Sequence, residues 1–306
     1  MLGAATSLNG DGAVFSPSRE GDVSYVRIEI DGCTYSLALT DAATDYIQRQ
    51  INETGLPYEL AMLREMRTRL DPGDLVVDVG ANIGNHSIFL AAVAGCRVVA
   101  FEPNTRLLQG LQSSIHANNL GPLVEVYAYA IGSVDGRGRF VQARPDNLGS
   151  QSIVPGAGEI EIRSLDGFGF TNVRALKIDV ESMELEVLMG AAKLIAEQRP
   201  LVYVECWSPD AYDGVSDFLV PLDYDCWSTF NRTPTHLFCP SERATVATKV
   251  SRLLRHAGRE TYSRHRLNQI WHRLNDLTVG RSAASEDSEL VAEVRRLIEA
   301  LEERPS

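Results

Sequence analysis

The chain of 306 residues is 44% hydrophobic and 23% charged, with a formal net charge of −12. This composition is typical of an ordinary globular protein with one large domain and appendages, and the negative charge argues against a general nucleic-acid binder. The longest apolar run, residues 88–96, is too short to cross a bilayer, and residues 1–22 lack the features of a signal peptide. We therefore expect a cytoplasmic protein without a transmembrane segment.

The N-terminal part of the chain predicts a leader and a hairpin. Residues 1–22 are rich in glycine, serine and alanine, which is typical of a flexible leader. Residues 26–39 alternate between apolar and polar side chains around Asp31-Gly32, and this pattern is a strong signal for a β-hairpin.

Two helices are expected next, at residues 41–50 and 58–70, and the second ends where a proline and a glycine follow. We expect residues 23–72 as a whole to form an N-terminal cap over a sheet. The cap could contribute to a substrate pocket, and Tyr58 and Glu59 are the positions to examine for that role.

The most informative stretch predicts a strand, a glycine turn and a helix around Asp78. A dinucleotide fingerprint needs glycines at the first, third and sixth positions of such a turn. Gly80 satisfies the first position, but Asn82 and Asn85 occupy the other two. An acid two residues before the first glycine, followed by Asn82 and Gly84, instead resembles motif I of the S-adenosylmethionine-dependent methyltransferases. The resemblance implies that Asp78 faces the aminocarboxypropyl end of the cofactor.

A second buried strand, residues 97–103, carries Glu102 at its end, 18 residues beyond Gly84. Nucleotide sites place a carboxylate near this position, because it can accept two hydrogen bonds from the ribose hydroxyls. The alternative is a solvated acid at the end of a strand. A helix over residues 104–118 and a third strand over residues 124–131 are expected to follow.

Residues 135–169 are rich in turns, and Asn147 lies in a polar stretch within them. This stretch suits a loop over an active site, or equally a plain surface loop.

Lys177, Asp179 and Glu181 alternate with apolar residues at the end of a fourth strand, the edge where open α/β sheets bind ligands. A short helix over residues 185–190 follows. A fifth strand, residues 200–206, carries Glu205 near its end.

Residues 218–227 and 233–238 look like antiparallel closing strands. The predicted fold is an α/β, Rossmann-like class I methyltransferase fold, with a mostly parallel seven-stranded sheet and helices on both faces.

Four motifs together resemble the FkbM family of methyltransferases over about residues 55–240. They are Asp78-Val-Gly-Ala-Asn-Ile-Gly84, Phe101-Glu-Pro103, Lys177-Ile-Asp-Val-Glu181, and the run Gly190…Arg199-Pro200…Glu205. The resemblance implies a methyltransferase domain at residues 73–240 that uses S-adenosyl-L-methionine. It also implies O-methylation of a sugar, a glycan or a glycosylated or polyketide-derived natural product. The chain departs from the family at Ser182, where a glycine is common, and this leaves the acceptor open.

The resemblance assigns roles to particular residues. The cofactor is expected to contact Asp78, Gly80, Asn82, Gly84, Glu102, Asn104, Ala130 and Asp179. In catalysis, Asp179 would act as the base or orient the acceptor, Glu181 would bind the acceptor hydroxyl, and Lys177 would keep both acids charged. Acceptor contacts are expected at Asn147, Glu205 and His86, with His86 as a reserve base.

Four alternatives stay open, two for these residues and two for the chain as a whole. The Lys177 group could be a purely structural ion-pair cluster. Asp179, Glu181 and Glu205 could hold a divalent cation, although no metal is expected. The chain could also be a catalytically impaired cofactor-binding scaffold or, less in keeping with Asn82, a nicotinamide-dependent oxidoreductase.

Residues 241–306 predict a C-terminal helical extension. Residues 241–281 carry a local charge of +6 and two amphipathic helices, which could pack on the acidic domain or bind an acidic partner or an anionic membrane. Apolar residues at heptad-like spacing over 290–301 favour self-association or an assembly partner.

Overall fold

The computed structural model describes residues 23–142 and 151–243. The expected leader, Asn147 and nearly all of the expected C-terminal extension lie outside the described residues. The chain divides into two compact units, Met1–Ser241 and Glu242–Ser306, and the elements below belong to the first.

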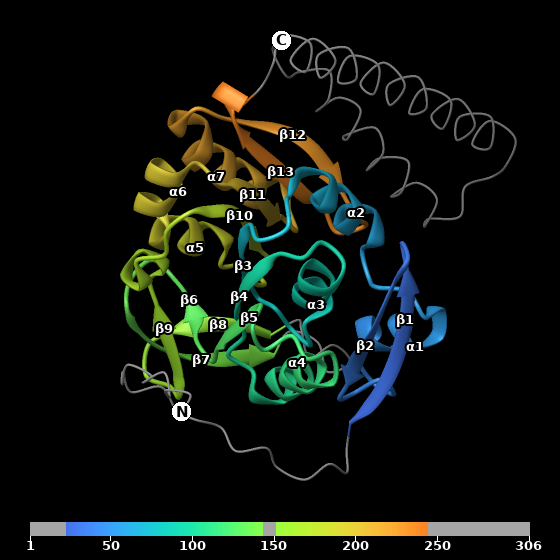
Figure 1. Cartoon of the computed structure of the whole chain (residues 1–306). Coiled ribbons are helices and arrows are strands. Elements are labelled where there is room, and N and C mark those ends of the chain that lie inside the picture. The colour runs from blue at the N-terminus through green and yellow to red at the C-terminus, as the bar shows by residue number, and fades with distance from the viewer. Residues whose placement is uncertain (1–22, 143–150, 244–306) are drawn as a thin grey trace, which may run out of the picture. The chain divides into compact units, whose positions relative to one another are not determined.

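A seven-stranded sheet forms the centre of this unit, in the order β12-β13-β11-β10-β3-β4-β5 (Figure 1). Its strands are β3 (Leu75–Val79), β4 (Arg97–Phe101), β5 (Val124–Tyr127), β10 (Val173–Ile178), β11 (Leu201–Glu205), β12 (Tyr224–Phe230) and β13 (Thr235–Pro240). The five strands from β11 to β5 are parallel, whereas β13 runs antiparallel to both β11 and β12. The sheet is therefore mixed but mostly parallel.

The strand order reverses direction beside β3. The chain moves outward on one side through β4 and β5, then returns to place β10 and β11 on the other side. The crevice outside the carboxyl ends of the strands at such a switch point is where open α/β sheets bind ligands. The ends of β3, β4, β10 and β11 meet at this edge.

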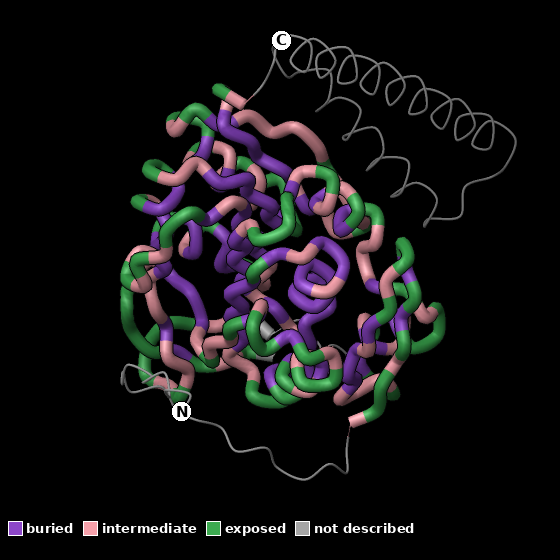
Figure 2. The backbone as a smooth tube through the Cα atoms, viewed as in Figure 1, coloured by how far each residue is buried: buried purple, intermediate pink, exposed green. Residues whose placement is uncertain are grey.

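Helices cover both faces of the sheet. Alternate residues of each strand point to opposite sides, so apolar side chains on both faces have to be buried. Val76 of β3 packs in a core with α1 (Tyr46–Thr54), α2 (Leu60–Arg69), α3 (Asn85–Ala92) and α4 (Thr105–Ala117). Its neighbour Val77 packs in a second core with α5 (Glu184–Gly190), α6 (Ala192–Gln198) and α7 (Pro209–Leu219). The central strands are accordingly buried along almost their whole length (Figure 2).

The expected hairpin is present as β1 (Ser24–Ile30) and β2 (Cys33–Leu39). Asp31 and Gly32 connect the strands with φ of 50° and 80°, the left-handed values that a two-residue hairpin turn requires. The hairpin is attached to the end of α4, where the Ser36 N–H donates to Asn118 Oδ1 at 2.7 Å. Helix α1 begins later than expected, because Asp45 caps it and accepts from the Gln48 N–H at 2.9 Å.

The region after β5 differs from the expectation. The third strand ends at Tyr127, and the chain then enters a separate four-stranded sheet in the order β6-β9-β7-β8. Its strands are β6 (Ala130–Ile131), β7 (Gly136–Gln142), β8 (Gln151–Pro155) and β9 (Ile160–Arg163). Glycine allows this packing, since a Cβ at Gly158 would lie 1.9 Å from the Gly138 carbonyl oxygen. The glycines that indicated a turn-rich segment therefore also serve close strand packing.

The expected strand over residues 218–227 is wrong in its first part. Phe218 lies in α7, whose cap Ser208 accepts from the Ala211 N–H at 3.1 Å, with Pro209 in the first helical turn. A serine cap followed by proline is a helix start signal, and it explains the difference. The helix α6 was also not predicted.

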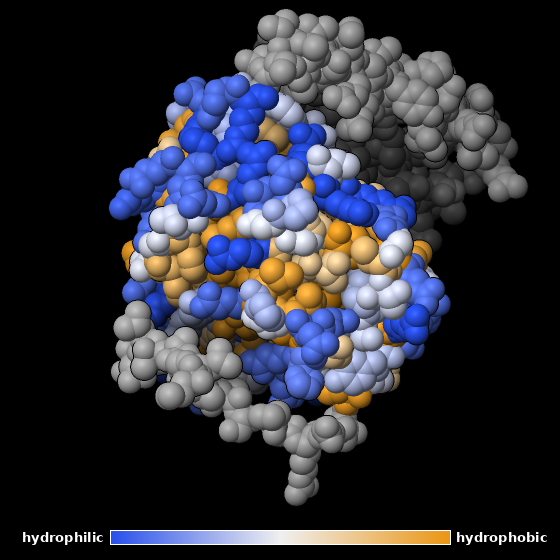
Figure 3. Space-filling model, in the orientation of Figure 1, coloured by the Kyte–Doolittle hydropathy of each residue, from blue (hydrophilic) through white to orange (hydrophobic). Residues whose placement is uncertain are grey.

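Surface hydropathy varies over the face seen in Figure 3, where hydrophobic residues gather near the middle and hydrophilic residues cover much of the rest. Among the described residues, no helix combines the length and the apolar character needed to cross a membrane.

Gly80 is the tightest point of the turn that follows β3, and it yields a prediction. An added Cβ there would lie 1.8 Å from the Asp179 carbonyl oxygen, and φ is +79°. We expect Gly80→Ala to lower the free energy of unfolding by at least about 3 kcal/mol, measured by urea unfolding.

Gly73→Ala is the matched control, because Gly73 has φ of +90° but nothing within 4 Å of an added Cβ. This variant should lose only about 1 kcal/mol, the conformational contribution alone. Equal losses in the two variants would show that the contact with Asp179 is unimportant.

Candidate active site

A cavity of about 570 Å³ lies at the carboxyl edge of the sheet. Its wall combines the turn after β3, the ends of β4, β10 and β11, and residues of the N-terminal cap. Nine of the predicted site residues line it: Gly80, Asn82, His86, Glu102, Ala130, Lys177, Asp179, Glu181 and Glu205. The structure therefore brings most of the predicted residues to one place.

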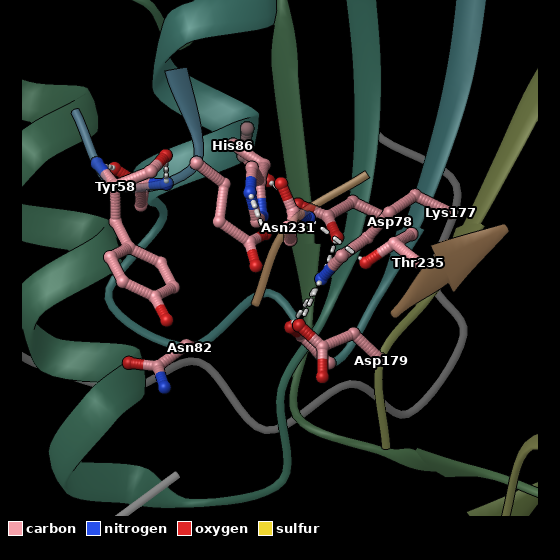
Figure 4. A network of polar contacts seen from close by, with 12 residues as sticks. Tyr58, Asp78, Asn82, His86, Lys177, Asp179, Asn231 and Thr235 are labelled. Carbon is pink, nitrogen blue, oxygen red and sulfur yellow. Dashed lines mark hydrogen bonds and ion pairs between the residues drawn. The ribbon is translucent and has the colours of Figure 1, made fainter. Parts of the chain in front are cut away.

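Lys177 is the central cation of the site and is 1% exposed. Its Nζ donates to the Gly80 carbonyl oxygen at 3.0 Å and lies 3.1 Å from Asp78 Oδ1 and 3.4 Å from Asp179 Oδ2 (Figure 4). Burial alone would lower the pKa of Lys177, but the charges of Asp78 and Asp179 outweigh it and raise the pKa above its usual range. Lys177 thus stays charged and joins β3 to the end of β10.

This arrangement refines the expectation for Lys177. The structure shows ion pairs of Lys177 with Asp78 and Asp179, so Asp78 is a partner of Lys177 that the sequence did not indicate. The reason is the register, in which Lys177 lies directly beside Asp78 on the adjacent parallel strand.

Asp179 and Glu205 form a carboxyl pair at the ends of β10 and β11. Burial would raise the pKa of Asp179, but Lys177 and a hydrogen bond with Glu205 hold it below its usual range. Burial and the nearby negative charge of Asp179 raise the pKa of Glu205 instead. At neutral pH, Asp179 is therefore an anion and Glu205 is protonated, because the charge of half-buried Asp179 disfavours a second charge on the buried Glu205 beside it.

Glu102 ends β4 at another part of the cavity wall. Its two carboxylate oxygens accept the Asn82 N–H at 2.9 Å and the Asn104 N–H at 2.7 Å. Burial raises the pKa of Glu102 to about 7 in spite of these bonds. The carboxyl group is thus fixed in position with lone pairs left for a ligand.

Three of the predicted cofactor residues have supporting positions rather than places on the wall. Asp78 is fully buried and accepts the Ser87 hydroxyl at 2.6 Å besides its contact with Lys177. Gly84 caps α3 with φ of 90°. Asn104 caps α4, where its Oδ1 accepts from Arg106 N and Leu107 N. All three hold the elements that carry the wall.

The cap and the loops contribute further wall residues, of which the sequence analysis had named Tyr58 and Glu59. Tyr46, Tyr58 and Glu59 come from the cap, and Trp207 and Arg232 come from the loops after β11 and β12. Tyr58 and Glu59 stood out only as positions to examine. Trp207 and Arg232 follow strand ends, which is the signal that could have indicated them.

An aromatic cluster supports the wall near Ala130. Phe101 stacks on Tyr127 with ring centroids 5.2 Å apart, and Phe168 meets both rings edge-on. Tyr129 lies in the same cluster and lines the cavity. The cluster offers a flat apolar surface at the end of the cavity near β6.

Backbone strain follows β10. Glu181 and Ser182 have φ of 30° and 74°, values that side chains other than glycine rarely adopt. Position 182 is therefore left-handed, which gives a physical reason for the glycine that is common there.

In residues 23–142 and 151–243, no group of three or more His, Cys, Asp or Glu side chains has an arrangement that could hold a metal ion.

Residues 78–226 match the methyltransferase FkbM domain family. The match covers just under half of the chain, and the cavity is the candidate active site of the matched methyltransferase domain. The match includes Asp78, Glu102, Lys177, Asp179 and Glu205, the residues described above.

Individual proteins show more distant likenesses. AMB antimetabolite synthetase AmbE from Pseudomonas aeruginosa is 28% identical, over 46% of this chain and 9% of its own length. The chain thus spans under a tenth of that curated relative. The crystal structure of methyltransferase FkbM from Methylobacillus flagellatus KT is 21% identical, with a TM-score of 0.44, over 65% of this chain and 47% of its own. An rRNA methylase from Streptococcus thermophilus is 16% identical, with a TM-score of 0.39, over 60% of this chain and 93% of its own.

The left-handed backbone at position 182 predicts that Ser182→Gly stabilises the protein. Ser182 is exposed, so the substitution removes little packing and relieves an unfavourable backbone conformation. We expect the free energy of unfolding to rise by roughly 1 kcal/mol in urea unfolding. Ser133→Gly, at a loop residue without positive φ, is the control and should be neutral or destabilising. A destabilised Ser182→Gly protein would contradict the strain at this site.

Glu102 predicts a particular pH dependence of stability. Its pKa is raised from 4.5 to about 7 on folding, so the folded protein keeps a proton that the unfolded chain releases. The stability linked to this proton is fully present below pH about 4.5 and is lost as the pH rises through about 7. The loss attributable to Glu102 is at most about 3 kcal/mol.

Glu102→Gln removes this titration while Glu184 and Glu205 still titrate in both proteins. The variant should lose less stability than the wild type between pH 5 and pH 8 in urea unfolding. If the two proteins lose the same amount, Glu102 has an ordinary pKa.

Proposed function

We propose that the chain is an S-adenosylmethionine-dependent O-methyltransferase whose acceptor is a hydroxyl of a sugar, a glycan or a glycosylated or polyketide-derived natural product. The observation that carries the proposal is the acidic cavity at the sheet's switch point, most of whose lining residues belong to the part that matches the methyltransferase FkbM domain. The finer fold assignment, a Rossmann-like class I methyltransferase, is part of the same proposal and is supported by the strand order.

The residues of the wall fit the chemistry of this cofactor. Glu102 presents a fixed carboxyl group to the cavity, which suits a ribose diol, and Ala130 lies beside the aromatic surface of Tyr129, which suits an adenine ring. Asp179 supplies a fixed negative charge that suits the positive sulfonium. Gly80 and Asn82 form the turn between these groups.

S-adenosylmethionine, when bound, would supply an electrophilic methyl group. The chain's own part is then to position the acceptor, exclude water and remove a proton. Asp179 keeps its charge through Lys177 and Glu205, and a carboxylate with a lowered pKa is a weak base. Of its two predicted roles, orienting the acceptor is therefore the one we propose for Asp179.

Acceptor recognition is proposed for the part of the cavity formed by the cap, Glu181 and Glu205. The protonated carboxyl of Glu205 can donate a hydrogen bond, and the negatively charged side chains can accept hydrogen bonds from hydroxyl groups. The likeness to an antimetabolite synthetase supports a natural product among the acceptor classes.

We expect S-adenosylhomocysteine to raise the melting temperature of the protein, because a ligand that binds only the folded state stabilises it. NAD should leave the melting temperature unchanged. Labelled S-adenosylmethionine with a panel of methyl glycosides, nucleotide sugars and polyketide alcohols should then give a labelled product.

Glu102→Ala is the control for the position of the cofactor. It should weaken S-adenosylhomocysteine binding at least tenfold through the loss of the ribose partner, whereas Glu125→Ala on the exposed part of β5 should not. Stabilisation by NAD alone would overturn the proposed function. Binding of S-adenosylhomocysteine without any methyl transfer across the panel would favour a scaffold.

A further inference from the structure

Two consecutive residues of the cap interlock with two consecutive residues of α3. The Tyr58 N–H donates to Asn85 Oδ1 at 2.9 Å, and Asn85 Nδ2 donates back to the Tyr58 carbonyl oxygen at 3.0 Å. In the next position of each segment, Glu59 Oε2 lies 3.1 Å from His86 Nε2. Figure 4 shows Tyr58 and His86 on neighbouring segments of the network. The amide of Asn85 thus fixes the backbone that places Glu59 opposite His86.

The Glu59–His86 contact is enclosed, with 8% of the Glu59 side chain and 7% of the His86 side chain exposed. Both residues nevertheless line the cavity. The Nε2 atom of His86 is buried and has no aligned hydrogen bond, so the contact with Glu59 is one of close approach. A buried imidazole against a carboxylate at a cavity wall is an arrangement suited to proton transfer.

The backbone conformation of Glu59 supports a functional role for this residue. Glu59 is the N-cap residue of α2, but its side chain makes no capping hydrogen bond and its φ is 58°. The residues that usually cap a helix are Ser, Thr, Asp and Asn, and a left-handed conformation is unfavourable for a glutamate. The side chain is directed to His86 instead, and strain of this kind is concentrated at functional sites.

The charged groups around His86 leave it as the available base. Glu59 faces it from the cap, and Asp179 interacts with it electrostatically from the end of β10. Lys177 and Glu205 interact with these carboxylates in turn. Asp179 is tied to Lys177 and Glu205, whereas the contact of the imidazole with Glu59 is made through one ring nitrogen, Nε2.

We propose that His86 is the catalytic base that takes the proton of the acceptor hydroxyl, and that Glu59 is the positioning residue that orients its ring. This inference rests on the proposed O-methyl transfer. The hydroxyl O–H bond breaks and its proton goes to His86 Nδ1. The electron pair of the oxygen forms the bond to the methyl carbon, and the electrons of the carbon–sulfur bond leave with the sulfur. Glu59 then stabilises the imidazolium through Nε2.

The first test separates binding from turnover, with the acceptor found in the panel of methyl glycosides, nucleotide sugars and polyketide alcohols. His86→Ala should bind S-adenosylhomocysteine within about threefold of the wild type and lower kcat by roughly 10²-fold or more. Added imidazole should restore part of the kcat. Glu59→Gln should lower kcat by roughly tenfold, with partial recovery in Glu59→Asp.

His116→Ala and Glu53→Gln are the matched controls, since both residues are exposed helix positions outside the cavity. They should leave kcat and binding unchanged. Unchanged kcat in His86→Ala, or a loss of kcat that imidazole does not relieve in a folded variant, would overturn the assignment of His86.

The second test needs no acceptor. Nitrogen-15 NMR of the histidine rings, with S-adenosylhomocysteine bound, should show His86 protonated at Nε2 in the wild type. In Glu59→Gln, the ring tautomer ratio of His86 should shift, with no change in Glu53→Gln. An unaltered His86 signal in Glu59→Gln would overturn the pair. If the signal shifts but the panel gives no methyl transfer, the proposed O-methylation fails while the Glu59–His86 pair stands.

Discussion

The charge of buried Lys177 is the interaction on which the rest of the site depends. An ammonium group that is 1% exposed is stable only with partners, and removal of one partner from a buried pair typically destabilises a protein by about 3–5 kcal/mol. Asp78, Asp179 and the Gly80 carbonyl oxygen supply these partners from two strand ends. The ion pairs therefore fix the glycine turn against the end of β10, and this shapes the cavity wall.

The same interaction separates the charge states of the acids. Lys177 holds Asp179 in its ionised form, and the Asp179 charge in turn favours the protonated form of Glu205. Glu102, farther along the edge, is bound by two backbone N–H groups and responds mainly to burial. A single acidic cavity thus contains a permanent anion, a hydrogen-bond donor and a carboxyl group that titrates near neutral pH. The three carboxyl groups of this site therefore differ in their protonation and in the interactions that they can make.

Much of this arrangement could be predicted from the sequence, because buried strands are apolar runs whose ends are visible. Asp179, Glu205 and Glu102 each follow such a run, and parallel strands bring their carboxyl ends to one edge. The partner of Lys177 was not predictable in the same way. It depends on the register between β10 and β3, which places Asp78 beside the lysine.

The contacts made by the cap were also beyond the sequence patterns. Glu59 reaches His86 only because Asn85 binds the backbone of Tyr58, a contact between segments 27 residues apart that no periodicity encodes. The sheet of β6 to β9 was missed for a related reason. Its glycines allow close strand packing, and the same glycines indicate turns when they are seen in sequence alone.

A crystal structure of the full chain grown with S-adenosylhomocysteine would test the central claim, that the cavity at the switch point is a methyl-transfer site. We predict that the ribose hydroxyls bind the Glu102 carboxyl group, the adenine lies beside Ala130 and Tyr129, and the sulfur faces Asp179. Density for the nucleoside outside this cavity, or a ribose turned away from Glu102, would contradict the claim.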